Sequence, residues 1–159
     1  MDDPTEQSQW RSLSELRARM DADIARIYTE RQIKGLKPSF VMELLRLHAQ
    51  GPMTITELAE SVGRTHSALS QKVSAMRAAG LVRTVPGTDA RSTKVALTAK
   101  AKGIVDLLAA EWRATEAAIT ELEAEVPYPM TQLVRDIEQA LERKSFHDRI
   151  AEKLEQQNQ

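Results

Sequence analysis

TITELAESVGRTHSALSQKVSAMRAAGLVRTVPGTDARSTKVALT, residues 54–98, holds two short segments with helical apolar spacing and then two segments rich in β-branched residues. The first segment places Leu58, Ala59 and Val62 on one helical stripe, and Gly63 follows them as a C-terminal stop. The sequence therefore predicts a short helix that ends at this glycine.

The second segment predicts a longer helix, capped by Thr65 and ended by Gly80. Its apolar residues turn one face toward a core: Leu69, Val73 and Met76. The opposite face is small and polar and carries no acid: Ser67, Gln71, Ser74 and Ala78, flanked by Ser70, Lys72 and Arg77. A helix that lies in a DNA major groove needs such a face, because bulk or negative charge would keep it from base edges and phosphates.

The rest of the stretch predicts a β-hairpin with a basic tip. Its strands are residues 81–85 and 93–97, which are rich in β-branched side chains. Arg91 lies at the tip, and Arg83 and Lys94 lie on the arms. A basic tip beside such a helix suits a minor groove, where the potential is most negative. The helices and the hairpin together predict a winged helix-turn-helix.

Charge is segregated along the chain, although the formal net charge of its 159 residues is only −1. Residues 34–103 carry eleven Lys and Arg against four Asp and Glu, a net of +7, whereas the remaining segments carry eleven against nineteen, a net of −8. A basic module between acidic arms is the pattern expected of a DNA-binding centre on a separate scaffold.

Several classes of function are excluded by composition. Without cysteine there is no disulfide, thiolate metal site or thiol switch, and His48, His66 and His147 lack metal-ligand spacing, so we expect no cofactor. No nucleophile–base pair, carboxylate pair or phosphate loop is visible, so we do not expect an enzyme. No apolar run approaches the ~20 residues of a membrane span, and the N-terminus lacks the features of a signal peptide. We therefore expect a soluble cytoplasmic protein.

The chain before this stretch predicts two amphipathic helices and a short strand. The expected elements are a helix from a cap at Ser8 or Ser12 to about Gly35, a helix from about Pro38 to Gly51, and a strand Met53–Ile55 ahead of a cap at Thr56.

The chain after it predicts two more helices, one from a cap at Thr98 to the prolines at 127 and 129, and a last one from Thr131 to about Leu154. Long apolar stripes of this kind have too little partner surface within one chain, and a two-fold homodimer is the commonest solution. The predicted domains are therefore 1–35 and 99–159 for dimerisation and 36–98 for DNA binding.

Four segments together closely resemble the MarR family of bacterial transcription regulators, over essentially the whole chain: Glu57–Ala59, Ala79–Val82, Asp89–Arg91, and Val95–Thr98 before a long helix. The resemblance implies a mainly α fold with a small β-wing (α+β), in which long terminal helices form a dimerisation domain. It also implies a homodimeric transcriptional regulator, expected to be a repressor, bound to a pseudo-palindromic operator in double-stranded DNA.

The resemblance also assigns roles to single residues. Ser67, Ser70 and Gln71 would read bases, Lys72 and Arg77 would contact phosphates, and Arg91 would enter the minor groove with Asp89 orienting it. The full predicted DNA-binding set is Thr65, His66, Ser67, Ser70, Gln71, Lys72, Ser74, Arg77, Arg83, Asp89, Arg91 and Lys94.

Sensing is a further implication of the resemblance. A small-molecule effector would bind between the dimerisation and winged domains, in a cavity lined by Trp10, Tyr28, Phe40 and Trp112, although such aromatic residues are more often core or dimer packing. Two alternatives stay open. One is a winged helix that binds a protein partner, and the other is the regulator half of a split acetyltransferase system.

Overall fold

The computed structural model describes residues 3–89 and 91–157; Ala90, the middle residue of the predicted wing-tip motif, lies outside them, as do positions 1, 2, 158 and 159 of the terminal segments. The described chain is mainly helical with one two-stranded antiparallel sheet, which confirms the predicted α+β fold class. None of its described helices has the length and apolar character needed to cross a membrane. Two compact units meet between Glu111 and Trp112, and each is described by itself.

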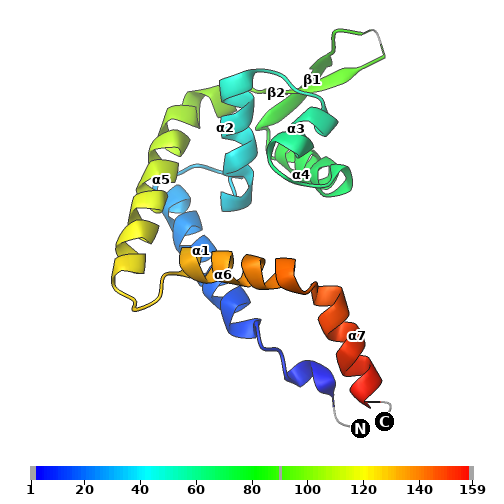
Figure 1. Ribbon diagram of the computed structural model, residues 1–159. Helices are drawn as coiled ribbons and strands as arrows, with labels where there is room; N and C mark the ends of the chain where they lie inside the picture. The colour runs from blue at the N-terminus through cyan, green and yellow to red at the C-terminus, as the bar shows by residue number, and fades with distance from the viewer. Residues whose placement is uncertain (1–2, 90, 158–159) are drawn as a thin grey trace. The chain divides into compact units, whose positions relative to one another are not determined.

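The first unit contains the winged part of the chain, drawn from blue to yellow-green in Figure 1. Its elements are η1 (Pro4–Glu6), α1 (Arg11–Glu30), η2 (Pro38–Phe40), α2 (Val41–Gln50), α3 (Ile55–Ser61), α4 (His66–Ala78), β1 (Val82–Pro86), β2 (Thr93–Leu97) and the first half of α5 (Ala99–Ala124).

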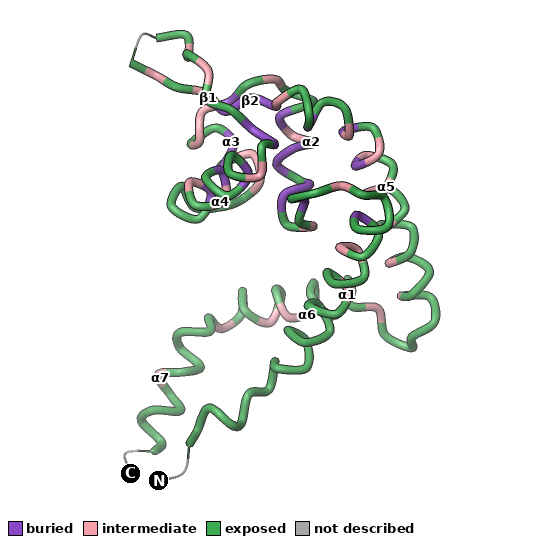
Figure 2. The backbone as a smooth tube through the Cα atoms, turned by 180° about the vertical axis from the view of Figure 1, so that it is seen from behind, coloured by how far each residue is buried: buried purple, intermediate pink, exposed green. Residues whose placement is uncertain are grey.

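The core of this unit is built from α2, α3, α4, the hairpin and the start of α5, where the buried positions gather in Figure 2. The predicted inner face of α4 is confirmed, since Leu69, Val73 and Met76 are all buried. Full burial of an aliphatic side chain contributes roughly 1.5–3 kcal/mol. The three residues therefore hold α4 on the unit and fix which face it turns outward.

Both ends of α4 are set by local sequence. The Thr65 hydroxyl accepts a hydrogen bond from the Ala68 backbone N–H at 3.2 Å, which confirms the predicted N-cap. At the other end Gly80 has φ +71°, a left-handed conformation that glycine adopts without steric cost. The helix therefore starts and stops where its sequence predicts.

The hairpin β1–β2 is the wing, and it projects from the helices α3 and α4 (Figure 1). Val82 pairs with Leu97 and Thr84 with Val95, which puts these residues on one face of the hairpin. At the turn the Gly87 N–H donates to the Ser92 carbonyl at 2.8 Å, and a Cβ on Gly87 would lie 2.0 Å from the Ser92 hydroxyl. A side chain at this position would have to displace the Ser92 hydroxyl.

Four predicted boundaries in this unit are wrong. The helix α1 ends at Glu30 rather than near Gly35. The N-cap of α1 is Trp10 rather than Ser8 or Ser12, and it makes no side-chain capping bond. The N-cap of α3 is Thr54 rather than Thr56, because Thr54 and Glu57 form a reciprocal capping box. The predicted strand Met53–Ile55 is reduced to one β-bridge between Met53 and Val95, since the chain turns into α3 directly afterwards.

The second unit holds the end of α5, α6 (Met130–Arg143) and α7 (Phe146–Gln157). The prediction of one continuous last helix is wrong, because Lys144 has extended backbone angles (φ −154°, ψ 118°). Ser145 then caps α7 by accepting a hydrogen bond from the Asp148 N–H at 3.1 Å. Ser145 and Asp148 stand three residues apart, which is the spacing of a capping box.

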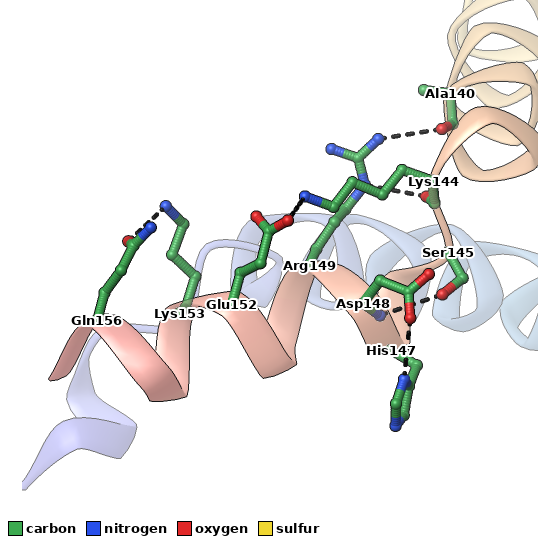
Figure 3. Close-up of polar contacts among 9 residues, drawn as sticks. All are labelled: Ala140, Lys144, Ser145, His147, Asp148, Arg149, Glu152, Lys153 and Gln156. Carbon is green, nitrogen blue, oxygen red and sulfur yellow. Dashed lines mark hydrogen bonds and ion pairs between the residues drawn. The ribbon is translucent and has the colours of Figure 1, made fainter. Parts of the chain in front are cut away.

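Side chains across this junction reinforce the break (Figure 3). Arg149 Nη2 donates to the Ala140 carbonyl at 3.0 Å and Arg149 Nε to the Lys144 carbonyl at 3.2 Å, so a guanidinium satisfies carbonyls at the end of α6. Lys144 forms an ion pair with Glu152 on α7. The two helices are thus joined by a defined corner.

Candidate nucleic-acid interface

The outer face of α4 is exposed and free of acidic side chains. Ser67, Gln71 and Ser74 are exposed on it, as are His66 and Thr65 at its N-terminal end. Opposite the buried stripe, this face presents hydroxyl and amide groups that donate and accept hydrogen bonds. Its small side chains allow close approach to a groove floor, and its dipole places partial positive charge at the Thr65 end.

Two serines of the predicted DNA-binding set differ in exposure. Ser74 is exposed, and its hydroxyl donates to the Ser70 carbonyl one turn earlier at 3.1 Å. Ser70 itself is only partly exposed, since it lies at the edge of the buried stripe. The centre of the outer face is therefore Ser67, Gln71 and Ser74.

Arg77 joins α4 to the wing. Its Nη2 donates to the Thr84 hydroxyl on β1 at 3.0 Å, while the side chain stays exposed. One guanidinium has five N–H donors, so this bond leaves others available for a phosphate. The contact also fixes the hairpin against the last turn of α4.

Lys72 differs from the expectation that it contacts phosphate. Its Nζ lies 2.7 Å from Glu43 Oε1 and 2.9 Å from the Ser39 carbonyl, both in the first turn of α2 or just before it. Its side chain is 19% exposed, and that of Glu43 only 1%. The ammonium is thus turned into the protein as the counter-ion of a buried carboxylate. Sequence reasoning missed Glu43, although it stands four residues before the buried Leu47 on the same helical face.

The wing residues divide between two faces and the tip. Arg83 pairs with Ala96 and Lys94 with Val85, so Arg83 and Lys94 lie on the face opposite Thr84 and Val95. Lys94 is partly exposed, and its charge is one of the weaker influences on Glu57, whose pKa is lowered mainly by the hydrogen bond from the Thr54 backbone N–H. Arg83 is exposed.

Arg91 is exposed at the tip, as the sequence predicts from its position. Asp89 acts on the loop through its backbone: its carbonyl accepts from the Ser92 N–H at 2.9 Å, and its N–H donates to the Ser92 hydroxyl at 3.3 Å. Within residues 3–89 and 91–157 no ion pair joins the Asp89 carboxylate to Arg91. Asp89 and Ser92 therefore shape the loop that carries the arginine.

The aromatic residues expected at an effector site are placed differently from one another. Tyr28 is buried and its hydroxyl donates to Glu111 Oε2 at 2.8 Å; burial, followed by this carboxylate, strongly raises the pKa of the tyrosine. Phe40 is buried beside α2, whereas Trp10 is 63% exposed. Trp10 and Tyr28 stand eighteen positions apart along α1, about 27 Å. Trp112 belongs to the second unit.

No group of three or more His, Asp or Glu residues in the described ranges is arranged to hold a metal ion. The arrangement offers instead two separated sets of polar and cationic groups, one on α4 and one on the wing. Such a pair can contact base edges and phosphates in neighbouring grooves.

Comparison with known proteins supports the architecture. A family model described as HVO_A0114 matches residues 41–104, the winged part of the chain. No curated protein sequence matches the chain. The crystal structure of the Mycobacterium tuberculosis transcriptional regulator MosR in complex with DNA is 25% identical, with 84% of this chain and 93% of that chain covered and a TM-score of 0.59.

Two further solved structures share the fold. The Staphylococcus aureus MepR–DNA complex is 14% identical over 85% of this chain and 96% of that chain, with a TM-score of 0.61. A MarR protein from Peptoclostridium difficile is 19% identical over 92% of this chain and 96% of that chain, with a TM-score of 0.58. The three structures extend the likeness beyond the winged part to most of the chain.

Proposed function

Because this chain is a winged-helix protein of the MarR type, we propose that it is a sequence-specific DNA-binding transcriptional regulator that acts as a repressor. The observation that carries the proposal is the exposed, acid-free outer face of α4, held outward by three buried residues of the same helix. The MosR and MepR structures contain DNA, which supports double-stranded DNA as the partner.

In this proposal α4 enters the major groove and the wing enters the minor groove beside it. Ser67 and Gln71 read base edges, and Arg77 and the N-terminal turn of α4 contact phosphates. Arg91, carried by the wing loop, enters the narrow, negative minor groove. Residues 36–98 form the DNA-binding domain in a protein that works with the chromosome in the cytoplasm.

We further propose a homodimer built by residues 1–35 and 99–159. In α6 and α7 not one described residue is buried, and large apolar side chains remain exposed along both helices: Met130, Leu133, Val134, Leu141, Phe146, Ile150 and Leu154. Apolar stripes of this size call for a second copy of the same surface. Two copies of α4 would then meet half-sites about one helical turn apart.

An effector that changes the spacing of the two copies of α4 would release the DNA, because two-site binding tolerates little misfit. Light scattering tests the proposed homodimer: the 17.8 kDa chain should have twice its monomer mass at micromolar concentration. A stable monomer there would refute the dimer.

The DNA-binding proposal is tested with two variants and one control. DNA retained by the purified protein is sequenced to define the operator, and binding is then measured by fluorescence anisotropy at ~150 mM salt. Arg91→Ala should weaken binding to all duplexes, and Gln71→Ala should relax sequence preference at one position by about 1–3 kcal/mol. Arg143→Ala on α6 removes the same charge from the other unit and should leave affinity unchanged.

Unchanged affinity in both α4 and wing variants would contradict the groove assignment. The salt dependence of binding distinguishes this proposal from a winged helix that binds a protein partner. Phosphate contacts release counterions, so DNA affinity should fall steeply as the salt concentration rises.

A further inference from the structure

The ion pair between the buried Glu43 and the partly exposed Lys72 lies on the flank of α4, beside its outer face. Lys72 follows Gln71 in the sequence, so its Cα lies about 100° around the helix from a residue at the centre of that face. A lysine has four methylenes and rotates freely in solvent, so an unpaired Lys72 would bring its ammonium to the rim of a groove. In the structure it turns the other way, toward Ser39 and Glu43.

Glu43 has only one side-chain partner for its carboxylate among the described residues, and this dependence holds Lys72 in place. Glu43 is 1% exposed, and its Oε1 accepts from Lys72, while its Oε2 is buried with no hydrogen-bond partner among the described residues. Moving Lys72 to a phosphate would therefore leave a buried carboxylate without its counter-ion. Breaking such a pair costs more than an exposed phosphate contact returns, because water and salt screen the contact at the surface.

We propose that Glu43 is a specificity-determining residue that withholds the Lys72 charge from the DNA backbone; this inference rests on the proposed DNA-binding function. A lysine against phosphate adds affinity for every sequence equally, whereas the hydroxyl and amide groups of α4 distinguish bases. By keeping the ammonium inside, Glu43 lowers binding to unrelated DNA and so widens the gap between the operator and the rest of the genome. It acts through Lys72 and does not itself contact DNA.

The test is the salt dependence of binding to an unrelated duplex, because a purely structural role of Glu43 does not add a phosphate contact. Glu43→Met removes the acceptor and keeps an apolar side chain of similar length where Oε2 has no partner. With Lys72 released, the slope of log affinity against log salt should steepen by about 0.9, and affinity at ~0.15 M salt should rise about fivefold.

Two controls isolate the lysine. The Glu43→Met/Lys72→Met double variant replaces the pair by apolar groups, which proteins tolerate well, and its slope should return to that of the wild type. Glu60→Met on α3 removes an exposed carboxylate that makes no ion pair with any described residue, so it changes net charge alone and should leave the slope unchanged.

A Glu43→Met slope equal to that of Glu60→Met, or a raised slope that persists in the double variant, would overturn the inference while leaving DNA binding intact. Wild-type protein that binds no duplex in a salt-dependent way would overturn the proposed function as well. Circular dichroism checks that each variant is folded. If Glu43→Met is not, Glu43→Gln takes its place, and its slope must also steepen for the inference to hold.

Discussion

Apolar side chains are buried in the winged region, residues 36–108, but remain exposed or only partly buried in the C-terminal helices, residues 112–157. Apart from Tyr28, every buried residue of the described chain lies in the winged region, and Leu58, Leu69 and Met76 have no exposed surface at all. The C-terminal helices bury none of their described residues, and Phe146 is 67% exposed there. Figure 2 shows the contrast along α6 and α7.

The stability of the chain is divided unequally between these two regions. Burial of apolar surface contributes roughly 25 cal/mol per Å², so the winged region carries its own folding free energy. The C-terminal helices gain that term only when another surface covers them. The proposed reading face is therefore held within one chain, whereas the fraction of chains in the proposed dimer would depend on protein concentration.

The two regions should differ most when one leucine side chain in each of them is truncated to alanine. Leu69→Ala opens a cavity in the winged core and should lower the free energy of unfolding by about 2–5 kcal/mol in urea denaturation. Leu133→Ala on α6, where the side chain is 41% exposed, should leave the unfolding of dilute protein nearly unchanged. Equal losses in both variants would mean that α6 is buried within a single chain.

A charge on the apolar stripe of α6 should weaken the proposed dimer rather than destabilise the single chain. Leu133→Glu would place a carboxylate against apolar surface in the proposed dimer, and we expect the dissociation constant to rise roughly 30-fold, about 2 kcal/mol. Sedimentation equilibrium measures it. Gln139→Glu adds the same charge on the opposite face of the helix and should change little. Comparable dimer constants for the two variants would count against the stripe as the interface.

Matched helix caps give a smaller effect of the same kind. Thr54→Ala removes a cap from α3 in the winged region and should lower the free energy of unfolding by about 1 kcal/mol. Ser145→Ala removes the equivalent bond from α7, which buries nothing, so α7 should fray with no change in the main transition. Far-ultraviolet circular dichroism and a urea titration distinguish the two outcomes. A full kilocalorie lost in Ser145→Ala would show that α7 unfolds together with the core.

Sequence predicts the winged region well because its determinants are local. The spacing of Leu69, Val73 and Met76, the cap at Thr65 and the stop at Gly80 all lie within one helix, and each is confirmed. At the C-terminus the same kind of periodicity predicted one helix where the structure has two. Phe146, Ile150 and Leu154 continue the apolar stripe, so the pattern concealed the break that the cap of α7 produces.

The outward face of α4 could be predicted from the sequence, whereas the ion pair of Lys72 could not. Side-chain direction around α4 follows from helical geometry, which places Ser67 and Gln71 outward without any knowledge of the rest of the chain. The partner of Lys72 stands twenty-nine residues away on another helix. No local pattern connects them, so only the packed structure separates a lysine that faces a groove from one that neutralises Glu43.

The smallest expected effect is a pKa change at the two caps. The Ser145 hydroxyl, then His147 and Lys144, hold the pKa of Asp148 below its ordinary value of 3.8. A lowered pKa means that this contribution to stability is complete above pH 3.8 and is lost as the pH falls through the folded value. Because Ser145→Ala removes the first of these causes, the pKa of Asp148 should rise toward 3.8 in a carboxyl NMR titration.

Glu57 in the winged region is the matched case with a different expected outcome. Its pKa is lowered first by the backbone N–H of Thr54 and only second by the side chain, and Thr54→Ala keeps that N–H. The winged core fixes the backbone on both sides of the bond, so Glu57 should retain most of its lowered pKa in this variant. A full return to 4.5 would show that the hydroxyl, rather than the packed backbone, holds the carboxylate in place.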